Sequence, residues 1–180
     1  FDIPLYGKHM VSNAAAAIVI AKEIGIPQEQ IHQLLETFHN AKRRFAETKI
    51  GNCVIIDDYA HHPTEIKATL EAVKQKYPHK RLVVVFVPNT YSRTKDFKEE
   101  FIEAFEIADK TYLTEIDCNR ERPEDYPGIT SHIIVDNLKN GEMISLDTID
   151  KLKDEKDSVV CFLSCAYVDK LIDKFKTLIK

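Results

Sequence analysis

Apolar and polar positions form two kinds of pattern along the chain. Residues 53–56, 82–86, 112–113, 133–135 and 159–163 are short, continuous apolar runs, which are typical of strands buried on both faces of a sheet. Several of the intervals between these runs carry apolar residues at helical spacing. This alternation of strands and helices predicts an α/β fold with a doubly wound, mostly parallel sheet.

Three amphipathic helices are expected to cover this sheet. One begins at Pro63, a favoured first helical residue, another spans about residues 94–108, and the last spans 167–179. The positions expected to face the sheet are Ile66, Leu70, Val73, Phe97, Phe101, Ile102, Phe105, Val168, Leu171, Ile172, Phe175 and Leu178. Because these positions gather on one side of each helix, each helix can bury one face.

The first 40 residues have a different pattern, which predicts a pair of helices. Residues 11–24 are apolar and rich in alanine, and a second helix begins at about Gln28. The apolar stripe of this second helix consists of Ile31, Leu34, Leu35 and Phe38. The boundary between the helical pair and the sheet is expected near residues 40–48.

Composition and charge exclude several classes of protein. The chain has 180 residues, of which 44% are hydrophobic and 30% charged, so it can form a core and is not expected to be disordered. A net charge of −4 argues against a nucleic-acid partner. No signal peptide is visible, and no apolar run reaches the roughly 18 residues of a membrane span. We therefore expect a cytoplasmic protein with no membrane partner.

The cysteines and the adjacent histidines do not form a metal-binding pattern. The cysteines have no CxxC pair and no zinc spacing, so they are expected to be buried, reduced thiols; they are Cys53, Cys118, Cys161 and Cys165. His61 and His62 are adjacent, whereas histidine ligands on one face usually have helical or alternate spacing. No metal ligand is therefore predicted.

Polar side chains crowd the ends of three predicted strands. Residues 57–65 follow the first strand, residues 87–95 follow the second, and residues 115–122 follow the third. Ligands bind beyond the carboxyl ends of the strands in open α/β sheets. The sequence therefore predicts one polar site at one edge of the sheet.

Side chains after the first strand could bind a ligand or serve the structure. Asp58 can accept hydrogen bonds from ribose hydroxyls, and Tyr59 and His61 can stack on a base or hydrogen-bond to it. In the structural alternative, His62 caps the helix that follows and Asp57 binds nearby backbone.

The basic residues at the strand ends could likewise bind a ligand or be solvated surface charges. Arg93 lies at the start of a predicted helix, where anions are favoured, and arginine can bind carboxylate or phosphate through two hydrogen bonds. Arg43 and Arg44 could bind anions too, or all three arginines could be solvated surface charges. Lys42 and Lys95 are expected to be solvated.

Four segments resemble one protein family in order and spacing. The block Asp57–Leu70, DDYAHHPTEIKATL, resembles the C-terminal domain of the Mur ligase family. Residues 7–17 resemble the family's GxHNxxNAxAA helix, residues 42–45 its KRRFE hinge, and residues 88–94 its FQPHxYxRT motif. The resemblance covers most of residues 5–136.

The resemblance implies two domains and a reaction. It implies that residues 1–44 end the central ATPase domain and that residues 45–180 form the C-terminal Rossmann-like domain. The long block is close to that of members that act on UDP-N-acetylmuramate and L-alanine in peptidoglycan synthesis. Such enzymes use ATP and Mg²⁺ to phosphorylate the lactyl carboxylate, and the amine of L-alanine then attacks the acyl phosphate to give an amide, ADP and phosphate.

The chain has no glycine-rich phosphate loop ending in GK[ST]. The resemblance implies that this loop, and most of the magnesium site, belong to the missing central domain. The missing N-terminal and central domains are thus the expected protein partners, and the chain alone is expected to be catalytically silent.

The resemblance also implies roles for single residues. The residues expected to contact ATP are His9, Asn13 and Tyr59 around the adenine, and Arg44 and Asp58 at the phosphates or ribose. The residues expected to face the sugar-nucleotide carboxylate and the incoming amino acid are His61, Asn89 and Arg93. His61 and Arg93 would support catalysis, and no other catalytic residue is assigned.

Three alternatives remain open at this point. The first is the related ligase that attaches recycled murein tripeptide to UDP-N-acetylmuramate. The second is a degenerate nucleotide or sugar-nucleotide binding module, because Met10, Asn89 and the loop Ser164–Tyr167 depart from the family's motifs. The third is a free-standing nucleotide-binding protein, which the lack of a GxGxxG motif after the first strand disfavours.

Overall fold

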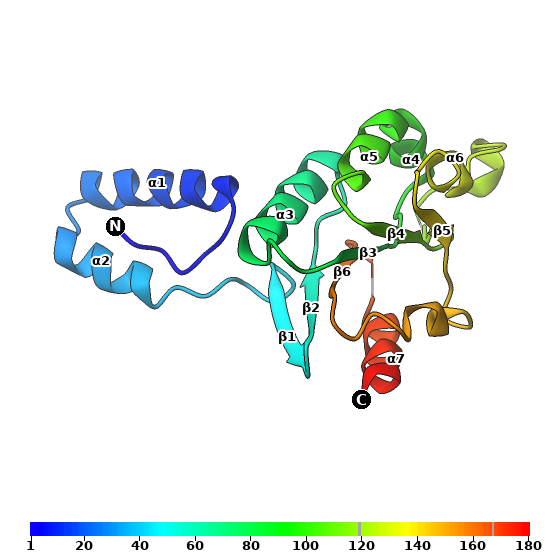
Figure 1. Cartoon of the computed structure of the whole chain (residues 1–180). Coiled ribbons are helices and arrows are strands. Elements are labelled where there is room, and N and C mark those ends of the chain that lie inside the picture. Colours follow the sequence, from blue (N-terminus) through cyan, green and yellow to red (C-terminus); the bar gives the residue numbers. More distant parts are fainter. Residues whose placement is uncertain (119, 167) are drawn as a thin grey trace.

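The computed structural model describes residues 1–118, 120–166 and 168–180. Within these residues, six strands form one sheet in the order β1-β2-β6-β3-β4-β5 (Figure 1). The strands are β1 Ala46–Ile50, β2 Cys53–Asp58, β3 Leu82–Phe86, β4 Lys110–Leu113, β5 Gly141–Met143 and β6 Val159–Leu163. Every neighbouring pair except β1 with β2 is parallel, which confirms the predicted fold class.

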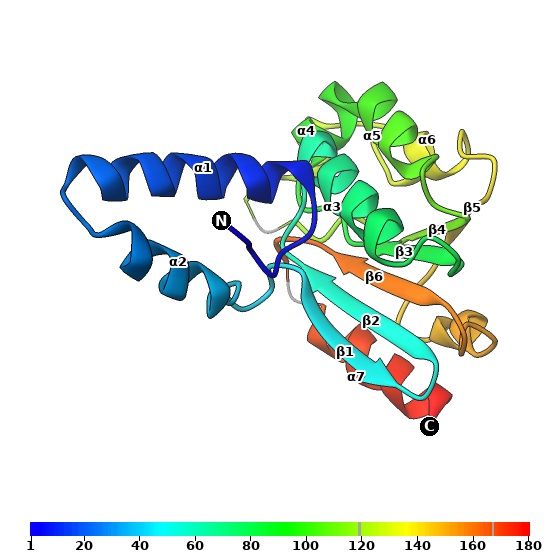
Figure 2. The same cartoon turned by 60° about the vertical axis from the view of Figure 1, so that its left-hand side comes forward.

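Helices cover both faces of the sheet, and a helical pair lies beside it (Figures 1 and 2). The described helices are α1 Lys8–Glu23, α2 Gln28–Glu36, α3 Pro63–Lys76, α4 Tyr91–Asp96, α5 Lys98–Phe105, α6 His132–Val135 and α7 Asp169–Ile179, with short 3₁₀ turns at Pro123–Asp125 and Ile149–Leu152. None of these helices combines the length and the apolar character that crossing a membrane requires.

Alternate residues of each strand point into two separate hydrophobic clusters. Val54 and Ile56 of β2 pack in the cluster that includes residues of α3, α5 and α6, whereas Cys53 and Ile55 pack in the cluster that includes residues of α7. The central strand β6 contributes to both clusters, and all five of its residues are buried. Burial on both faces explains why the strands appear in the sequence as continuous apolar runs.

The position of β6 gives the sheet a topological switch point, the place at which open α/β sheets bind ligands. The chain passes from β2 through α3 to β3, and β6 later inserts between the two strands. The connections after β2 and β3 lead to helices on one face, whereas β6 leads to α7 on the other (Figure 1). Neighbouring strands whose connections leave in opposite directions open a crevice at their carboxyl ends.

One predicted strand is wrong. Residues 133–135 belong to the short helix α6, in which Ile134 and Val135 are buried against the cluster around α5. Ser131, just before the helix, is fully buried, and its hydroxyl donates to the Thr114 carbonyl at 2.6 Å. A run of three β-branched residues fits a strand or a buried helical turn equally well, and here this tertiary contact selects the turn.

Two strands lie where no apolar run predicted them. The edge strand β1 pairs antiparallel with β2 through a tight turn at Gly51, whose φ is +56°. The other edge strand, β5, has three half-buried residues. Edge strands are partly solvated, so neither carries the continuous apolar run that marks a central strand.

The helix expected at residues 94–108 is two helices. α4 begins at Tyr91 after Thr90, whose hydroxyl accepts from the Arg93 amide at 3.4 Å, and the chain breaks at Phe97 before α5. The predicted inward positions Phe101 and Phe105 are buried against the sheet. α7 matches its prediction from Asp169 onward, and Tyr167 lies outside the described residues.

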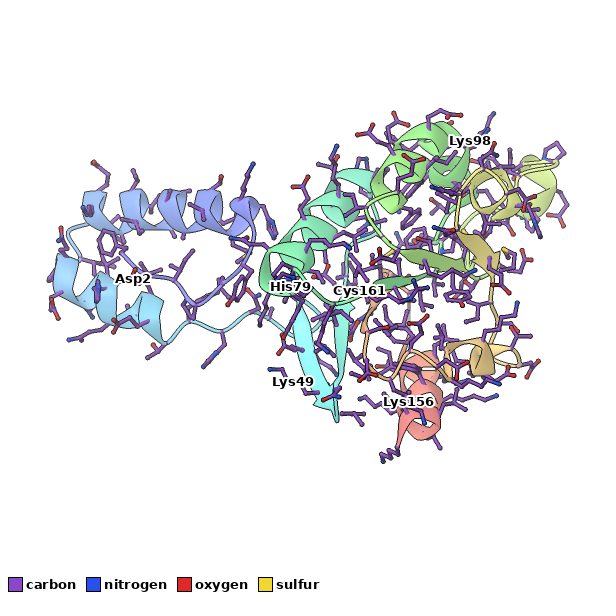
Figure 3. All side chains as sticks on the ribbon, in the orientation of Figure 1. Asp2, Lys49, His79, Lys98, Lys156 and Cys161 are labelled. Carbon is purple, nitrogen blue, oxygen red and sulfur yellow. The ribbon has the colours of Figure 1, made fainter. Side chains whose placement is uncertain are left out.

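The helical pair buries little of its apolar surface. No residue of α1 is buried, and α2 buries only Ile31. Leu34 and Phe38, which belong to the predicted apolar stripe, are 59% and 47% exposed. Figure 3 shows the side chains around α1 and α2 standing away from the rest of the molecule. The described residues thus leave the apolar face of this pair uncovered.

The cysteines divide into two groups that predict thiol reactivity. Cys53 and Cys161 are fully buried, and burial raises the pKa of Cys53 to about 11 and that of Cys161 further still. Cys118 and Cys165 are only half-buried.

Because thiolates are the reactive form, native protein should react with a thiol reagent at Cys118 and Cys165 first, as peptide mapping would reveal. Early modification of Cys161, enclosed between the helix layers (Figure 3), would contradict this packing.

Candidate functional site

The segment Arg43–Phe45 connects the helical pair to the sheet through an unusual backbone. Arg43 and Phe45 have φ values of +57° and +52°, a left-handed conformation that side-chain-bearing residues rarely adopt. The Phe45 amide donates to the Asp58 carboxylate at 2.7 Å, and the Tyr59 amide donates to the Arg43 carbonyl at 2.9 Å. The carboxyl end of β2 therefore holds this hinge in place.

The side chain of Arg43 fastens the hinge to two strand ends. Its Nε donates to Asp57 Oδ1 at 3.2 Å, and its Nη2 donates to the Ser164 carbonyl at 2.7 Å. Only 14% of the Arg43 side chain and 18% of the Asp57 side chain are exposed. Among the described residues, Asp57 thus pairs with a side chain and with no backbone donor, contrary to the structural alternative.

Asp58 is the most buried carboxylate of the site. It is 6% exposed, and its second oxygen accepts from the Ala60 amide at 2.8 Å. Burial raises the pKa of Asp58, while the Ala60 and Phe45 amides and the Arg44 charge oppose that shift. Burial of this carboxylate is therefore costly, and one amide from the hinge and one from the loop after β2 keep it in place.

Ser164 connects the three central strand ends. It is fully buried, its hydroxyl donates to the Val87 carbonyl at 2.8 Å, and it accepts from the Ala166 amide at 2.9 Å. Its own amide donates to the Asp58 carbonyl at 3.2 Å. Ser164, one of the departures from the family motif, is thus a structural connection in this chain.

His62 and Glu65 form the start of α3. His62 Nδ1 accepts from the Thr64 amide at 3.3 Å, which confirms the predicted cap. Glu65 Oε2 accepts from the amides of His61 and His62 at 3.0 and 3.2 Å. His61 Nδ1 lies 2.9 Å from the Tyr59 carbonyl and 3.2 Å from Glu65 Oε2, so two acceptors orient this one ring nitrogen.

A cavity of about 980 Å³ lies between the helical pair and the sheet. Its lining includes His9 and Asn13 from α1, Arg44 from the hinge and Asp58 from β2. Four of the five residues expected to contact ATP, which are far apart in sequence, therefore meet around one space. The cavity is also partly apolar, which suits a ligand that has a flat base and a charged tail.

Tyr59, the fifth of these residues, lies beside the cavity and is 37% exposed. The guanidinium carbons of Arg43 and Arg44 lie 5.4 and 5.3 Å from the centre of its ring. Such cation–π contacts orient the arginine groups. The Tyr59 ring is therefore in contact with both arginine side chains of the hinge.

The expected substrate residues are not in this cavity. Asn89 Nδ2 donates weakly to the Asp117 carbonyl at 3.5 Å, and both residues lie beyond the ends of β3 and β4. Arg93 Nη1 is buried and, among the described residues, has no hydrogen-bond partner. A buried guanidinium nitrogen without an acceptor is costly, and an anionic ligand would remove that cost.

The loop after β4 is bound to the start of α4, next to Arg93. Glu121 accepts from the Ser92 amide at 3.0 Å and from its hydroxyl at 2.5 Å. Burial raises the pKa of Glu121, but the Ser92 bonds and the Arg93 charge outweigh it, so the net shift is downward. Burial raises the pKa of the Cys165 thiol, and the nearby Arg93 charge opposes that shift.

The sequence interpretation missed some cavity residues. Lys42 and Lys76 both line it, although Lys42 was expected to be merely solvated. Lys42 and Lys95 are both exposed, as expected. Lysine near a helix end is common, so nothing in the sequence distinguished Lys76. Within the described residues, no cluster of three or more His, Cys, Asp or Glu side chains could hold a metal ion.

The fold and the site together define a Rossmann-like α/β protein with a cavity beside the carboxyl end of β2. Residues 43–164 match the family model described as "Mur ligase, glutamate ligase domain". The chain belongs to the Mur ligase family.

Known relatives agree with this assignment. The chain is 44% identical to UDP-N-acetylmuramate–L-alanine ligase of Lactobacillus acidophilus over 180 residues, which are 99% of this chain and 40% of the relative. The solved UDP-N-acetylmuramate–alanine ligase of Thermotoga maritima matches with a TM-score of 0.74 and 24% identity, over 98% of this chain and 38% of that one. A murein peptide ligase from Psychrobacter arcticus matches with a TM-score of 0.68 and 21% identity, over 99% and 38%. The chain thus spans about two fifths of the length of these proteins.

The Glu65 contacts lead to a prediction about stability and pH. Replacing Glu65 with Ala should lower the free energy of unfolding at neutral pH by about 1 kcal/mol, because two amides at the helix start lose their acceptor. Chemical denaturation measures this, and Glu71→Ala, an exposed position on the same helix, is the control.

The pH dependence of this difference follows from the pKa of Glu65. Burial raises that pKa, but the His61 and His62 amides and the His61 charge outweigh it, so the folded value is below the unfolded one. The folded state then binds fewer protons, and the stabilisation should disappear as the pH falls from about 5 to about 3. A difference between wild type and Glu65→Ala that persists unchanged in acid would contradict this account.

Proposed function

We propose that this chain is the C-terminal part of a cytoplasmic ligase that joins L-alanine to UDP-N-acetylmuramate with ATP, in peptidoglycan synthesis. The observation that carries the proposal is the cavity in which His9, Asn13, Arg44 and Asp58 meet. The name of a relative at 44% identity over almost the whole chain supports the same reaction. Such a reaction passes through an acyl phosphate, which the amine of L-alanine attacks to form the amide.

The proposal includes a division into residues 1–44, which end a central ATPase domain, and residues 45–180, the C-terminal domain. Large apolar residues on the helical pair support it, since a soluble helix rarely exposes so many; they are Val11, Val19, Ile20, Ile24, Leu34 and Phe38. Central and N-terminal domains, which would occupy the remaining length of the relatives, would cover this face.

ATP fits the residues around the cavity. The volume of the cavity lies near the upper end of the usual range of ligand pockets, about 300–1,000 Å³. His9 and Asn13 offer ring and amide groups to an adenine, and Tyr59 offers an aromatic edge. Arg44 supplies positive charge for the phosphates or the ribose. The contacts of Asp58 give it a second role, which is to fix the hinge that carries Arg44.

The amino acid and the sugar-nucleotide carboxylate would be bound at the ends of β2, β3 and β4. Arg93 has a buried Nη1 that lacks an acceptor within the described residues, and carboxylate is the acceptor that a guanidinium prefers. Asn89 would add an amide donor, and His61, held by the Tyr59 carbonyl and Glu65, would orient the reacting groups. These residues position substrates and neutralise charge.

Mg²⁺ would neutralise the phosphates during transfer. The two carboxylates at the end of β2 already have partners, because Asp57 binds Arg43 and Asp58 binds two amides. We therefore assign most of the magnesium site to the central domain and assign nucleotide positioning to this chain.

A ligase for recycled murein tripeptide is the second candidate, because the Psychrobacter arcticus murein peptide ligase shares this fold. Sequence identity favours L-alanine, since the relative at 44% is named for that amino acid. Offering L-alanine or the tripeptide to the same enzyme preparation separates the two. A degenerate binding module would accept neither.

The assay that tests this proposal is L-alanine-dependent ADP release by a polypeptide of the relatives' length that contains this chain. Asn13→Ala and Arg44→Met should each lower kcat/KM for ATP about tenfold or more, because each loses a contact to the nucleotide. Arg93→Met should instead raise the KM values of the amino acid or sugar nucleotide. Lys95→Met, an exposed cation on α4, is the control and should match wild type.

The same assay can also contradict the proposed function. The 180-residue chain alone should release no ADP in response to L-alanine, because it has no phosphate loop. Amide formation by this chain alone would contradict the assignment of phosphate binding to the central domain. A full-length wild type that is inactive with either amino acid or peptide would favour the binding module.

A further inference from the structure

The end of α3 makes a contact with the segment before α1 that is separate from the bonds between the hinge and β2. Lys76 Nζ lies 2.7 Å from Glu47 Oε2 on β1 and 4.8 Å from the centre of the Tyr6 ring, just before α1. Phe45 and Tyr77 complete the surroundings, with ring centres 5.7 and 5.6 Å from the same nitrogen. One cation therefore joins the segment before α1, the hinge, β1 and α3.

Gly7 brings the two backbones close at the same place. Its amide donates to Gln75 Oε1 at 3.2 Å, and its φ is +99°. A Cβ atom there would lie 3.0 Å from Ala72 Cβ and 2.7 Å from His9 Cε1. Only glycine satisfies both the backbone angle and this approach, so α1 begins directly against α3.

The Lys76 ammonium already has partners within the protein. Its side chain is 25% exposed and that of Glu47 is 20% exposed, so water screens the pair only partly. Burial raises the pKa of Glu47, but the Lys76 ammonium and Tyr77 outweigh it, and the net shift is downward. The Lys76 charge is thus satisfied by a carboxylate and aromatic rings and is not a free anion site.

This contact lies where it can set the width of the cavity. The chain crosses from the helical pair to the sheet once, at the hinge, and a single crossing leaves rotation about it free. The contact of Tyr6 and Gly7 with α3 is a second attachment point, and His9 follows in the first turn of α1. Tyr6, His9, Phe45 and Lys76 all line the cavity.

We propose that Lys76 is a positioning residue for the nucleotide: by holding Tyr6 against α3, next to the bond between Gly7 and Gln75, it places His9 at the cavity wall. We call Tyr6, Gly7, Glu47, Gln75 and Lys76 the α3 latch. The proposal rests on the proposed function for its ligand, but the latch itself can be measured without any ligand.

The first test compares Lys76→Met with Lys74→Met in the full-length protein. Lys74 is in the same last turn of α3 and pairs with Asp109 at 3.0 Å, away from the cavity. Lys76→Met should raise the KM for ATP about fivefold, which corresponds to about 1 kcal/mol, with kcat within about twofold of wild type. Lys76→Arg keeps the cation and should restore the KM, whereas Lys74→Met should leave it unchanged.

The second test measures amide hydrogen exchange without nucleotide. Lys76→Met should speed exchange in peptides that contain residues 6–10, whereas Lys74→Met should not, because only the former frees the start of α1. Equal KM values and equal exchange in the two lysine variants would overturn the latch. A loss of kcat with unchanged KM would overturn it too. An inactive wild type would contradict the proposed function alone, since the exchange result would still decide the latch.

Discussion

The arrangement of this protein depends on the carboxylate of Asp58, which accepts one backbone amide from the hinge and one from the loop after β2. One oxygen holds the Phe45 amide and the other holds the Ala60 amide. Two left-handed residues in a three-residue segment would be unfavourable without such support, and strained backbone of this kind persists only where surrounding contacts fix it. The hinge in turn fixes the point at which the helical pair joins the sheet, next to the cavity between them.

The site follows from this constraint and from the topology of the sheet. Because β6 inserts between β2 and β3, the buried Ser164 can connect all three strand ends, and Arg43 extends the connection to the hinge. These bonds connect the central strand ends, and among the described residues the helical pair is attached to the rest of the molecule at the hinge and at the α3 latch. The cavity proposed for the nucleotide lies between these two parts.

The sequence predicted what depends on burial and on local hydrogen bonds. The central strands and the core helices were found because full burial leaves continuous or periodic apolar residues, and the His62 cap was found because it is local. The edge strands β1 and β5 and the helix α6 were missed, since their identity depends on pairing partners and on one buried serine contact. The residues expected to contact ATP were predicted through the family resemblance. Four of them, His9, Asn13, Arg44 and Asp58, surround one cavity in the structure. Lys76 and the structural role of Asp58 could not be predicted, because both depend on contacts between distant segments.

The central claim is that the cavity between the helical pair and the sheet receives the base of an adenine nucleotide. Photolabelling of the full-length protein with 8-azido-ATP, followed by peptide mapping, tests it most directly. The account predicts that label appears in peptides from residues 4–13, 38–46 or 58–76, the segments that contain the residues lining the cavity, and that excess ATP removes it. Label that is confined to other peptides, or that ATP does not displace, would contradict the account.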